Sequence, residues 1–252
     1  MPIAYLRSLS GKERQPAANH QLGYSLCFIA GAVNAGGFLA VGQYTSHMSG
    51  MVSSMADQLV LGQLGLALAA LLAVLAFLSG AALTAIQVNW ARQRQLHSEF
   101  ALSLMLEAGL LLLFGLLGTA LARFFDWLMP LTTLLLCFIM GLQNAIVTKL
   151  SHAEIRTTHL TGMLTDIGIE LGKLLYVNRQ PGFEPVRVNR RKLSLLLGLV
   201  GSFFAGGLAG ALGFKWLGYA TTLALALWLA VLAVVPLWDD LRALWQARRT
   251  AR

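Results

Sequence analysis

Two histidines occur in nearly the same sequence setting, 112 positions apart. His47 lies in the stretch TSHMSGMVS, and His159 lies in the stretch TTHLTGMLT. An imidazole changes its charge near neutral pH, so two of them facing one cavity could bind a polar solute or carry protons. A glycine follows each histidine after three residues, Gly50 or Gly162, on the same helical face. We expect it to leave space beside the ring for a ligand or a helix; the alternative is a buried histidine bonded to a carbonyl.

Two asparagines upstream of these stretches are matched in the same way. Residues 27–35 read CFIAGAVNA and residues 137–145 read CFIMGLQNA, which pairs Asn34 with Asn144. An amide buried in an apolar environment needs a partner, which is either another helix or a solute. The two copies together predict one substrate-binding site made of Asn34, His47, Gly50, Asn144, His159 and Gly162.

A hydroxyl residue precedes each histidine and could begin a helix there. Ser46 and Thr158 are good N-cap residues by type. The start of a helix presents free backbone N–H groups and a positive dipole end to whatever lies in front of it. The sequence therefore predicts a site that favours anionic or polar groups.

Four carboxylates are candidates for coupling to protons or Na⁺: Asp57, Asp166, Glu170 and Glu107. Asp166 and Glu170 continue a helical stripe that begins at His159 and ends at Lys173. The alternative for this stripe is an amphipathic helix on the cytoplasmic surface, with its charges in water. Glu107 is the lone carboxylate of an apolar run, and such residues usually face the interior of a helical bundle.

The remaining reactive side chains give no sign of a cofactor. The two cysteines, Cys27 and Cys137, occupy matched positions, and two thiols cannot form a metal site alone. Motifs of soluble enzymes, such as a phosphate-binding loop or HExxH, are absent from the sequence. We therefore predict no metal, no cofactor, no catalytic residue and no enzymatic activity.

The elements that must position these residues are membrane helices. Hydrophobic residues make up 57% of the chain and charged residues 12%, whereas soluble domains carry about 25% charged residues. Six apolar runs approach the length that spans a bilayer as a helix: 22–42, 65–90, 101–122, 131–149, 193–214 and 217–238. We predict an all-α polytopic membrane protein of about six transmembrane helices, in two inverted three-helix repeats with a polar re-entrant or broken helix in each. The inversion follows because three spans per repeat is an odd number.

Basic residues set the predicted orientation. With six spans and a cytoplasmic N-terminus, all 19 Lys and Arg residues except Arg123 and Lys215 lie inside, as the positive-inside rule requires. The alternative makes residues 46–62 and 157–176 into two further spans and leaves more basic residues outside. We therefore expect a multi-pass membrane protein with both termini cytoplasmic. The predicted parts are an N-terminal tail (1–20), two repeats (21–125 and 126–240) and a basic C-terminal tail (241–252).

The second motif and its surroundings also carry a family resemblance. The stretch GLQNAIVTKLSHAEIRTTHLTGMLTDIG, with the earlier AGAVNAGGF and TSHMSGM, resembles the YoaK-like family of bacterial inner-membrane proteins, a domain of unknown function. The resemblance covers nearly the whole chain. It implies a bacterial membrane protein of about six spans with no established activity, and it brings no substrate, cofactor or catalytic residue.

The sequence favours a small secondary transporter or permease for an unknown polar or anionic solute, coupled to protons or Na⁺, because inverted repeats and interrupted helices are typical of that class. A non-catalytic assembly or regulatory protein is the first alternative, and an intramembrane enzyme acting on lipid or quinone is the second. Inversion would separate the two motif starts, which counts against the enzyme. Expected partners are the lipid bilayer and the solute, with no nucleic acid; a homo-oligomer stays open. A polar cavity between the two histidine segments would favour transport, and a packed core would favour the assembly protein.

Overall fold

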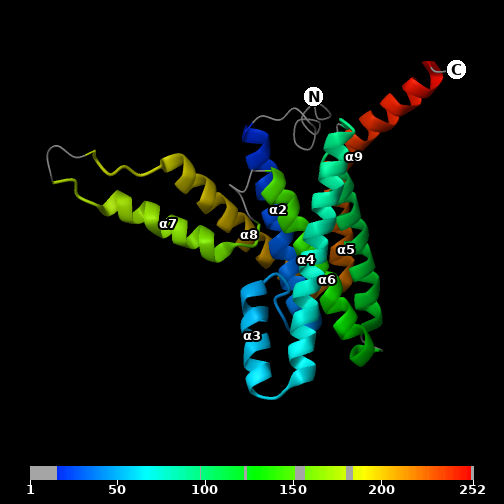
Figure 1. The fold of residues 1–252 in the computed structure, drawn as a ribbon, viewed down its shortest axis with the longest axis horizontal. Helices are drawn as coiled ribbons and strands as arrows, with labels where there is room; N and C mark the ends of the chain where they lie inside the picture. The colour runs from blue at the N-terminus through cyan, green and yellow to red at the C-terminus, as the bar shows by residue number, and fades with distance from the viewer. Residues whose placement is uncertain (1–15, 97, 122–123, 151–156, 180–183, 251–252) are drawn as a thin grey trace.

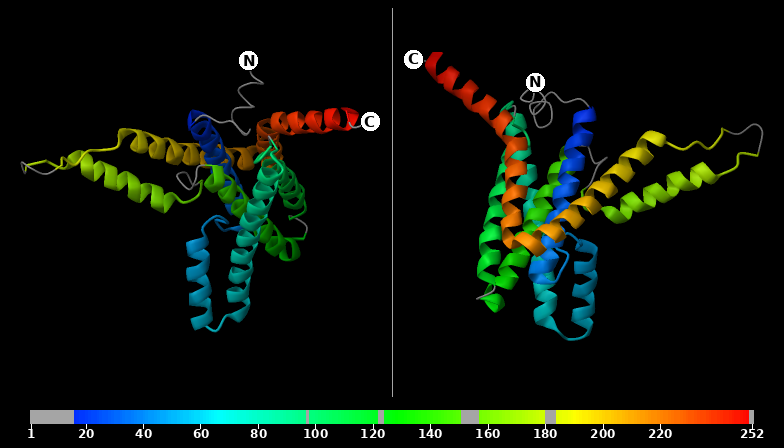
Figure 2. Two further views of the ribbon diagram at one scale, coloured as in Figure 1. Left: turned by 45° about the horizontal axis from the view of Figure 1, so that its top comes forward. Right: turned by 180° about the vertical axis from the view of Figure 1, so that it is seen from behind.

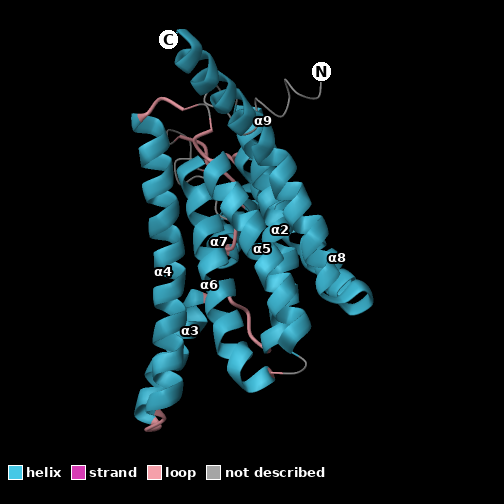
Figure 3. Ribbon diagram, turned by 90° about the vertical axis from the view of Figure 1, so that its right-hand side faces the viewer, coloured by secondary structure: helices cyan, strands magenta, loops and turns pink. Residues whose placement is uncertain are grey.

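The structure, a computed structural model, describes residues 16–250 apart from 97, 122–123, 151–156 and 180–183. Every regular element in this part of the chain is helical (Figure 1). The elements are α2 (Pro16–Val41), α3 (Met48–Val60), α4 (Leu64–Gln93), α5 (Ala101–Leu121), α6 (Phe125–Leu150), α7 (Leu160–Leu175), α8 (Arg190–Leu217), the 3-10 turn η1 (Gly218–Ala220) and α9 (Thr221–Thr250). Short loops join most of the helices (Figure 3). The predicted all-helical class is confirmed.

Five segments of the described chain are long and apolar enough to cross a membrane: Asn19–Val41, Leu64–Gln93, Ala101–Ala120, Leu128–Leu150 and Arg190–Arg242. The last segment contains both α8 and α9, joined by η1. Many large apolar side chains of α4 are exposed, among them Leu68, Leu75 and Leu78. A surface of this kind is unfavourable in water and suits contact with lipid, so these segments indicate a membrane protein.

The two histidine motifs form separate short helices rather than parts of the long ones. Gly42 follows α2 with φ +71°, and its N–H bonds the carbonyl of Phe38 at 2.9 Å, which ends the helix in a left-handed turn. The chain then crosses the first motif and begins α3. Gly62, also at φ +71°, turns the chain between α3 and α4. The α3–α4 hairpin and the α7–α8 pair extend from the central bundle in different directions (Figures 1 and 2).

The most extensive helix–helix contacts join the first copy of the repeat to the second. α2 packs mainly against α8, α6 packs mainly against α4, and α5 packs against α9. Two matched glycines allow the first two crossings. A Cβ built on Gly31 would overlap the carbonyl of Phe203, and a Cβ built on Gly141 would overlap the carbonyl of Phe77. Small residues of this kind let helix backbones approach closely in lipid.

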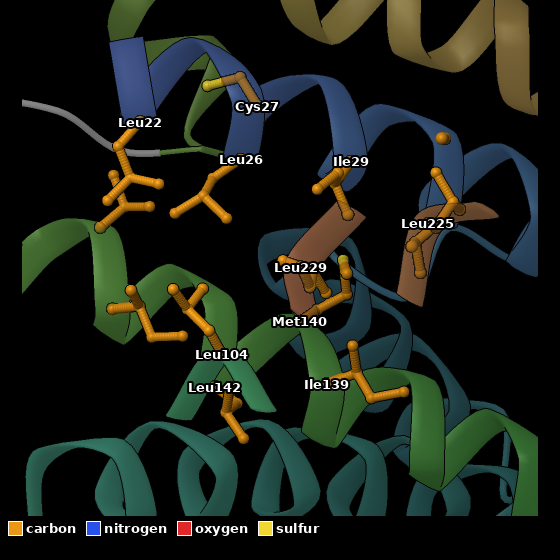
Figure 4. Packing of buried hydrophobic residues seen from close by; sticks show 14 of the residues in the cluster. Leu22, Leu26, Cys27, Ile29, Leu104, Ile139, Met140, Leu142, Leu225 and Leu229 are labelled. Atoms are coloured by element: carbon orange, nitrogen blue, oxygen red, sulfur yellow. The ribbon is translucent and has the colours of Figure 1, made fainter. Parts of the chain in front are cut away.

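The partner helices contribute glycines of their own to the same crossings. Gly80 of α4 lies against the carbonyl of Phe138, and Gly206 of α8 lies against the carbonyl of Phe28. Each pair therefore reproduces in one copy the contact that is found in the other. The core beside these crossings is a cluster of buried aliphatic side chains from α2, α5, α6 and α9, including Leu26, Leu104, Met140 and Leu229 (Figure 4).

Candidate functional site

A cavity of about 850 Å³ lies between the two histidine segments. Its volume falls in the range of about 300–1,000 Å³ that is usual for ligand sites. Both copies contribute matched residues to its lining: Asn34 with Asn144, Ser46 with Thr158, His47 with His159, Ser49 with Thr161 and Phe77 with Phe203. The long helices α2, α4, α6 and α8 and the starts of α3 and α7 thus all reach this cavity. The sequence argument that inversion separates the two motif starts was wrong, since the crossing of α2 and α6 brings both starts together.

The two asparagines fasten the motif segments to the long helices that precede them. Ser46 Oγ donates to Asn34 Oδ1 at 2.9 Å, across the turn between α2 and α3. In the second copy Asn144 Nδ2 donates to Thr158 Oγ1 at 2.6 Å and to the carbonyl of Met140 at 2.9 Å. Thr157 Oγ1 also donates to Asn144 Oδ1 at 3.2 Å. The structural role expected for a buried amide is therefore present in both copies.

The side-chain amides of Asn34 and Asn144 differ in how many of their hydrogen-bonding atoms have a partner in the described chain. Both hydrogen-bonding atoms of Asn144 are engaged with protein partners. Asn34 accepts one bond through Oδ1, and within the described chain its Nδ2 has no acceptor. Asn34 lines the cavity, so its amide N–H groups can donate to a bound solute.

The histidines themselves begin the motif helices. His47 (φ −88°, ψ 70°) is the N-cap of α3 and His159 (φ −83°, ψ 53°) is the N-cap of α7. The prediction that Ser46 and Thr158 cap these helices was wrong by one position, because their hydroxyls bond the asparagine amides instead. No side chain in the described part of the protein caps either helix, so first-turn N–H groups of both helices remain available beside the cavity.

Each histidine ring lies over the glycine of its own motif. A Cβ built on Gly50 would come within 2.8 Å of His47 Nδ1, and a Cβ built on Gly162 would overlap the ring of His159. The predicted space beside the histidine exists, and the imidazole itself occupies it. The glycines thus position the rings, which are exposed on the cavity side rather than buried in a packed core.

The carboxylates predicted to couple transport do not line this cavity. Asp57 is exposed near the far end of α3. Asp166 pairs with Lys192 Nζ of α8 at 3.1 Å. Glu170, 2% exposed, accepts from Lys173 Nζ at 2.8 Å and from the backbone N–H of Asn189 at 2.7 Å.

The carboxylates of the α7 stripe therefore face α8 rather than the cavity. The ion pair of Asp166 and the bonds of Glu170 connect α7 with the beginning of α8. The hydrogen bond from Lys173 and that from the Asn189 N–H hold the pKa of Glu170 below its ordinary value. These contacts stabilise the pair of helices α7 and α8. The charged residues of the stripe therefore have a structural role, which their spacing in the sequence alone does not reveal.

Glu107 lies elsewhere, in the middle of α5. Its side chain is completely buried, and neither carboxyl oxygen has a hydrogen-bond partner in the described part of the protein. An ionised carboxylate without a partner is costly in such surroundings. Among the predicted coupling residues, Glu107 is the buried carboxylate to which the described contacts give no structural role.

Sequence reasoning missed the aromatic part of the cavity. Phe77 and Phe203 lie on its wall, and Tyr44 and Thr148 line it as well. The two phenylalanines are matched, in FLSGAA and FFAGGL, three residues before the glycines of the helix crossings. Extending the repeat comparison into these long helices would have identified them. In the described chain no three His, Cys, Asp or Glu residues lie close enough to hold a metal ion.

The comparisons with known proteins extend over most of the chain. A family described as "Protein of unknown function (DUF1275)" matches residues 22–235. No curated protein and no solved structure matches the chain. The match agrees with the resemblance to an uncharacterised family, and the cavity is the remaining guide to function.

Proposed function

The chain belongs to the DUF1275 family of proteins of unknown function, and we propose that it is a small secondary transporter or permease for a polar or anionic solute. The cavity between the histidine segments carries this proposal, because most of its lining residues have polar side chains and because matched residues of both copies build it. Transporters with internal repeats bind their solutes at such a repeat interface, next to interrupted helices. A packed core at this place would have favoured an assembly protein instead.

The two halves would be inverted relative to one another, with three spans in each. The reciprocal crossings of α2 with α8 and of α6 with α4 support a twofold relation between the halves. The distribution of basic residues supports cytoplasmic termini. In this arrangement α3 and α7 are the interrupted helices, and their N-terminal ends meet at the shared cavity.

The solute would be held by the groups left available at the centre. The Asn34 amide can donate, the two imidazoles can donate when protonated, and the uncapped starts of α3 and α7 offer backbone N–H groups. All of these favour an anionic or strongly accepting group. Met48 and Leu160, which follow the histidines, add apolar surface to the lining.

Coupling to a proton gradient would use a group that can change its charge inside the protein. We assign this role to Glu107, because its carboxyl group is buried without a partner among the described residues. Asp166 and Glu170 are engaged in ion pairs that connect α7 with α8 or lie within α7, so we assign them a structural role. Asp57, at the exposed end of α3, would act only after a movement of that helix.

The test is uptake by liposomes that contain the purified protein. A panel of organic and inorganic anions, from small anions to anions that carry an alkyl chain, is offered with and without an imposed proton or Na⁺ gradient. Accumulation of one anion is expected, with loss in the pair of variants His47→Ala and His159→Ala. His20→Ala is the matched control, since His20 lies near the start of α2 and does not line the cavity. Absence of uptake over the whole panel, or full uptake by the double variant, would contradict the proposal.

A further inference from the structure

A second, apolar cavity of about 480 Å³ adjoins the polar one. It lies between α2 and α8, and Leu160 and Leu164 in the first turns of α7 also line it. Four residues line both cavities: Asn34, Tyr44, Leu160 and Phe203. The two cavities are therefore adjacent. Asn34, whose Nδ2 has no acceptor among the described residues, lies where polar lining changes to apolar lining.

The walls of this groove, as we call the second cavity, are suited to a hydrocarbon chain. Gly31 and Gly207 line it where α2 and α8 cross, and Phe38, Leu39 and Phe204 add large apolar side chains. Phe204 is 71% exposed and Leu39 is 57% exposed. Because both lie on apolar segments that can cross a membrane, the groove is open toward lipid and a chain could enter it sideways.

The second copy has a different lining at the matched places. Phe38 corresponds to Thr148, and Leu39 corresponds to Lys149. Thr148 lines the polar cavity, and Lys149 Nζ donates to Asn89 Oδ1 at 3.1 Å. The central site thus has an apolar extension on the side of α2 and polar residues on the side of α6. A small symmetric solute would need no such difference.

We propose that the solute of this site is an amphiphile, with an anionic head in the polar cavity and one alkyl chain in the groove. The inference rests on the proposed function and specifies the class of solute. The head would meet the imidazoles, the Asn34 amide and the uncapped helix starts, and the chain would lie along Phe38, Leu39 and Phe204. A fatty-acid carboxylate and an alkyl phosphate share this chemistry.

The test uses three photoreactive probes with the same twelve-carbon chain: dodecanoate, dodecyl phosphate and dodecanol, each with a diazirine at the chain end. The full chain is placed in nanodiscs of phosphatidylcholine, and the label in segments 31–44 and 200–211 is measured by mass spectrometry at equal probe density in the membrane. At least one anionic probe is expected to label these segments about tenfold more than dodecanol, since a charge-assisted hydrogen bond contributes that much to binding. The better probe identifies the head group as carboxylate or phosphate.

Two sets of variants distinguish the contribution of the anionic head group from that of the alkyl chain. His47→Ala with His159→Ala should remove the excess of the anionic probe over dodecanol. Gly207→Leu should also remove this excess, because the leucine side chain fills the groove. The fold should tolerate the substitution, since a Cβ at this position meets only the Gly31 carbonyl at 3.7 Å. Gly201→Leu is the matched control on α8, where a Cβ meets nothing within 4 Å, and it should label like the unaltered protein. Equal thermal unfolding of the two leucine variants would show that both fold.

The outcomes also separate this inference from the transport proposal. Equal labelling by all three probes, or an excess that persists in Gly207→Leu, would overturn the amphiphile assignment. Histidine-dependent uptake of butyrate or methyl phosphate by liposomes, with no groove labelling, would overturn it and leave transport of small anions standing. Histidine-dependent groove labelling without uptake of any probe would support the amphiphile site and contradict transport.

Discussion

Asn144 on α6 donates a hydrogen bond of 2.6 Å to the hydroxyl of Thr158, just before α7 begins. The same amide also bonds the carbonyl of Met140 and accepts from Thr157. Asn34, its counterpart on α2, makes one such contact, with Ser46. The two copies therefore differ at the cavity: Asn144 holds the start of α7 through both of its side-chain atoms, whereas the Nδ2 of Asn34 has no acceptor among the described residues.

This difference predicts unequal effects of the same substitution. Asn144→Ala removes three hydrogen bonds and should lower the free energy of unfolding by about 1 kcal/mol more than Asn34→Ala, given the usual strength of such bonds between membrane helices. Asn34→Ala should instead weaken solute binding with little loss of stability. Denaturant unfolding in detergent and solute binding, measured on both variants, check the prediction. Equal losses of stability would contradict the assignment.

The contact between Gly162 and the His159 ring predicts a position-specific effect on α7. Gly162→Ala would force the ring away from its place and should weaken solute binding by about tenfold, the value of one charge-assisted hydrogen bond. Gly168→Ala on the same helix meets nothing within 4 Å and should stabilise the protein by about 0.5–1 kcal/mol through helix propensity. Parallel binding and thermal measurements distinguish them. Unchanged binding in Gly162→Ala would mean that the ring position does not matter.

The surroundings of Glu170 predict a pH-dependent contribution to stability. The bonds from Lys173 and Asn189 lower the folded-state pKa below its ordinary value of 4.5, so the unfolded chain takes up a proton more readily than the folded one. The stabilisation is complete above pH 4.5 and is lost as the pH falls from there through the folded-state pKa. Thermal unfolding of the unaltered protein and of Glu170→Gln should therefore differ at about pH 7 and converge in acid. A difference that stays constant down to about pH 3 would contradict this role.

Substitution of Glu107 is expected to separate coupling to the proton gradient from binding of the solute. Glu107→Gln keeps the size of the side chain and removes its ability to change charge. Exchange of solute across the liposome membrane without a gradient should continue, whereas accumulation driven by a proton gradient should be lost. Glu99→Gln is a suitable control, because Glu99 pairs with Arg92 near the beginning of α5. Gradient-driven uptake that survives Glu107→Gln would assign coupling to another group, the cavity histidines first.

Sequence patterns located the long helices well. The apolar run 65–90 corresponds to α4 (Leu64–Gln93), and the run 131–149 lies within α6 (Phe125–Leu150). Long helices can be located in this way because apolar residues continue over the whole length of each helix, so the pattern depends only on the local sequence. The repeat also identified Asn34, His47, Asn144 and His159 as residues that would meet, because polar side chains on apolar helices turn away from lipid and toward the interior that both copies share.

Other features depend on contacts between distant parts of the chain and could not be predicted. Asp166 and Glu170 bond α8 and the residue before it because their face of α7 is turned toward α8. Helical spacing shows that the two residues share a face, but it does not specify which neighbour that face will contact. The N-cap shifted by one residue because the hydroxyls of Ser46 and Thr158 found partners on α2 and α6. The apolar groove required the crossing of α2 with α8, which only the folded chain contains.

Both histidine segments line one cavity, and a secondary transporter must open such a cavity to each side of the membrane in turn. Ser49→Cys and Thr161→Cys test it, because both positions line the cavity and the native Cys27 and Cys137 are buried. A membrane-impermeant thiol reagent, applied from either side in turn, should label each variant from both sides, and a bound solute should protect both positions in parallel. Labelling of one position only from outside and of the other only from inside would contradict the account.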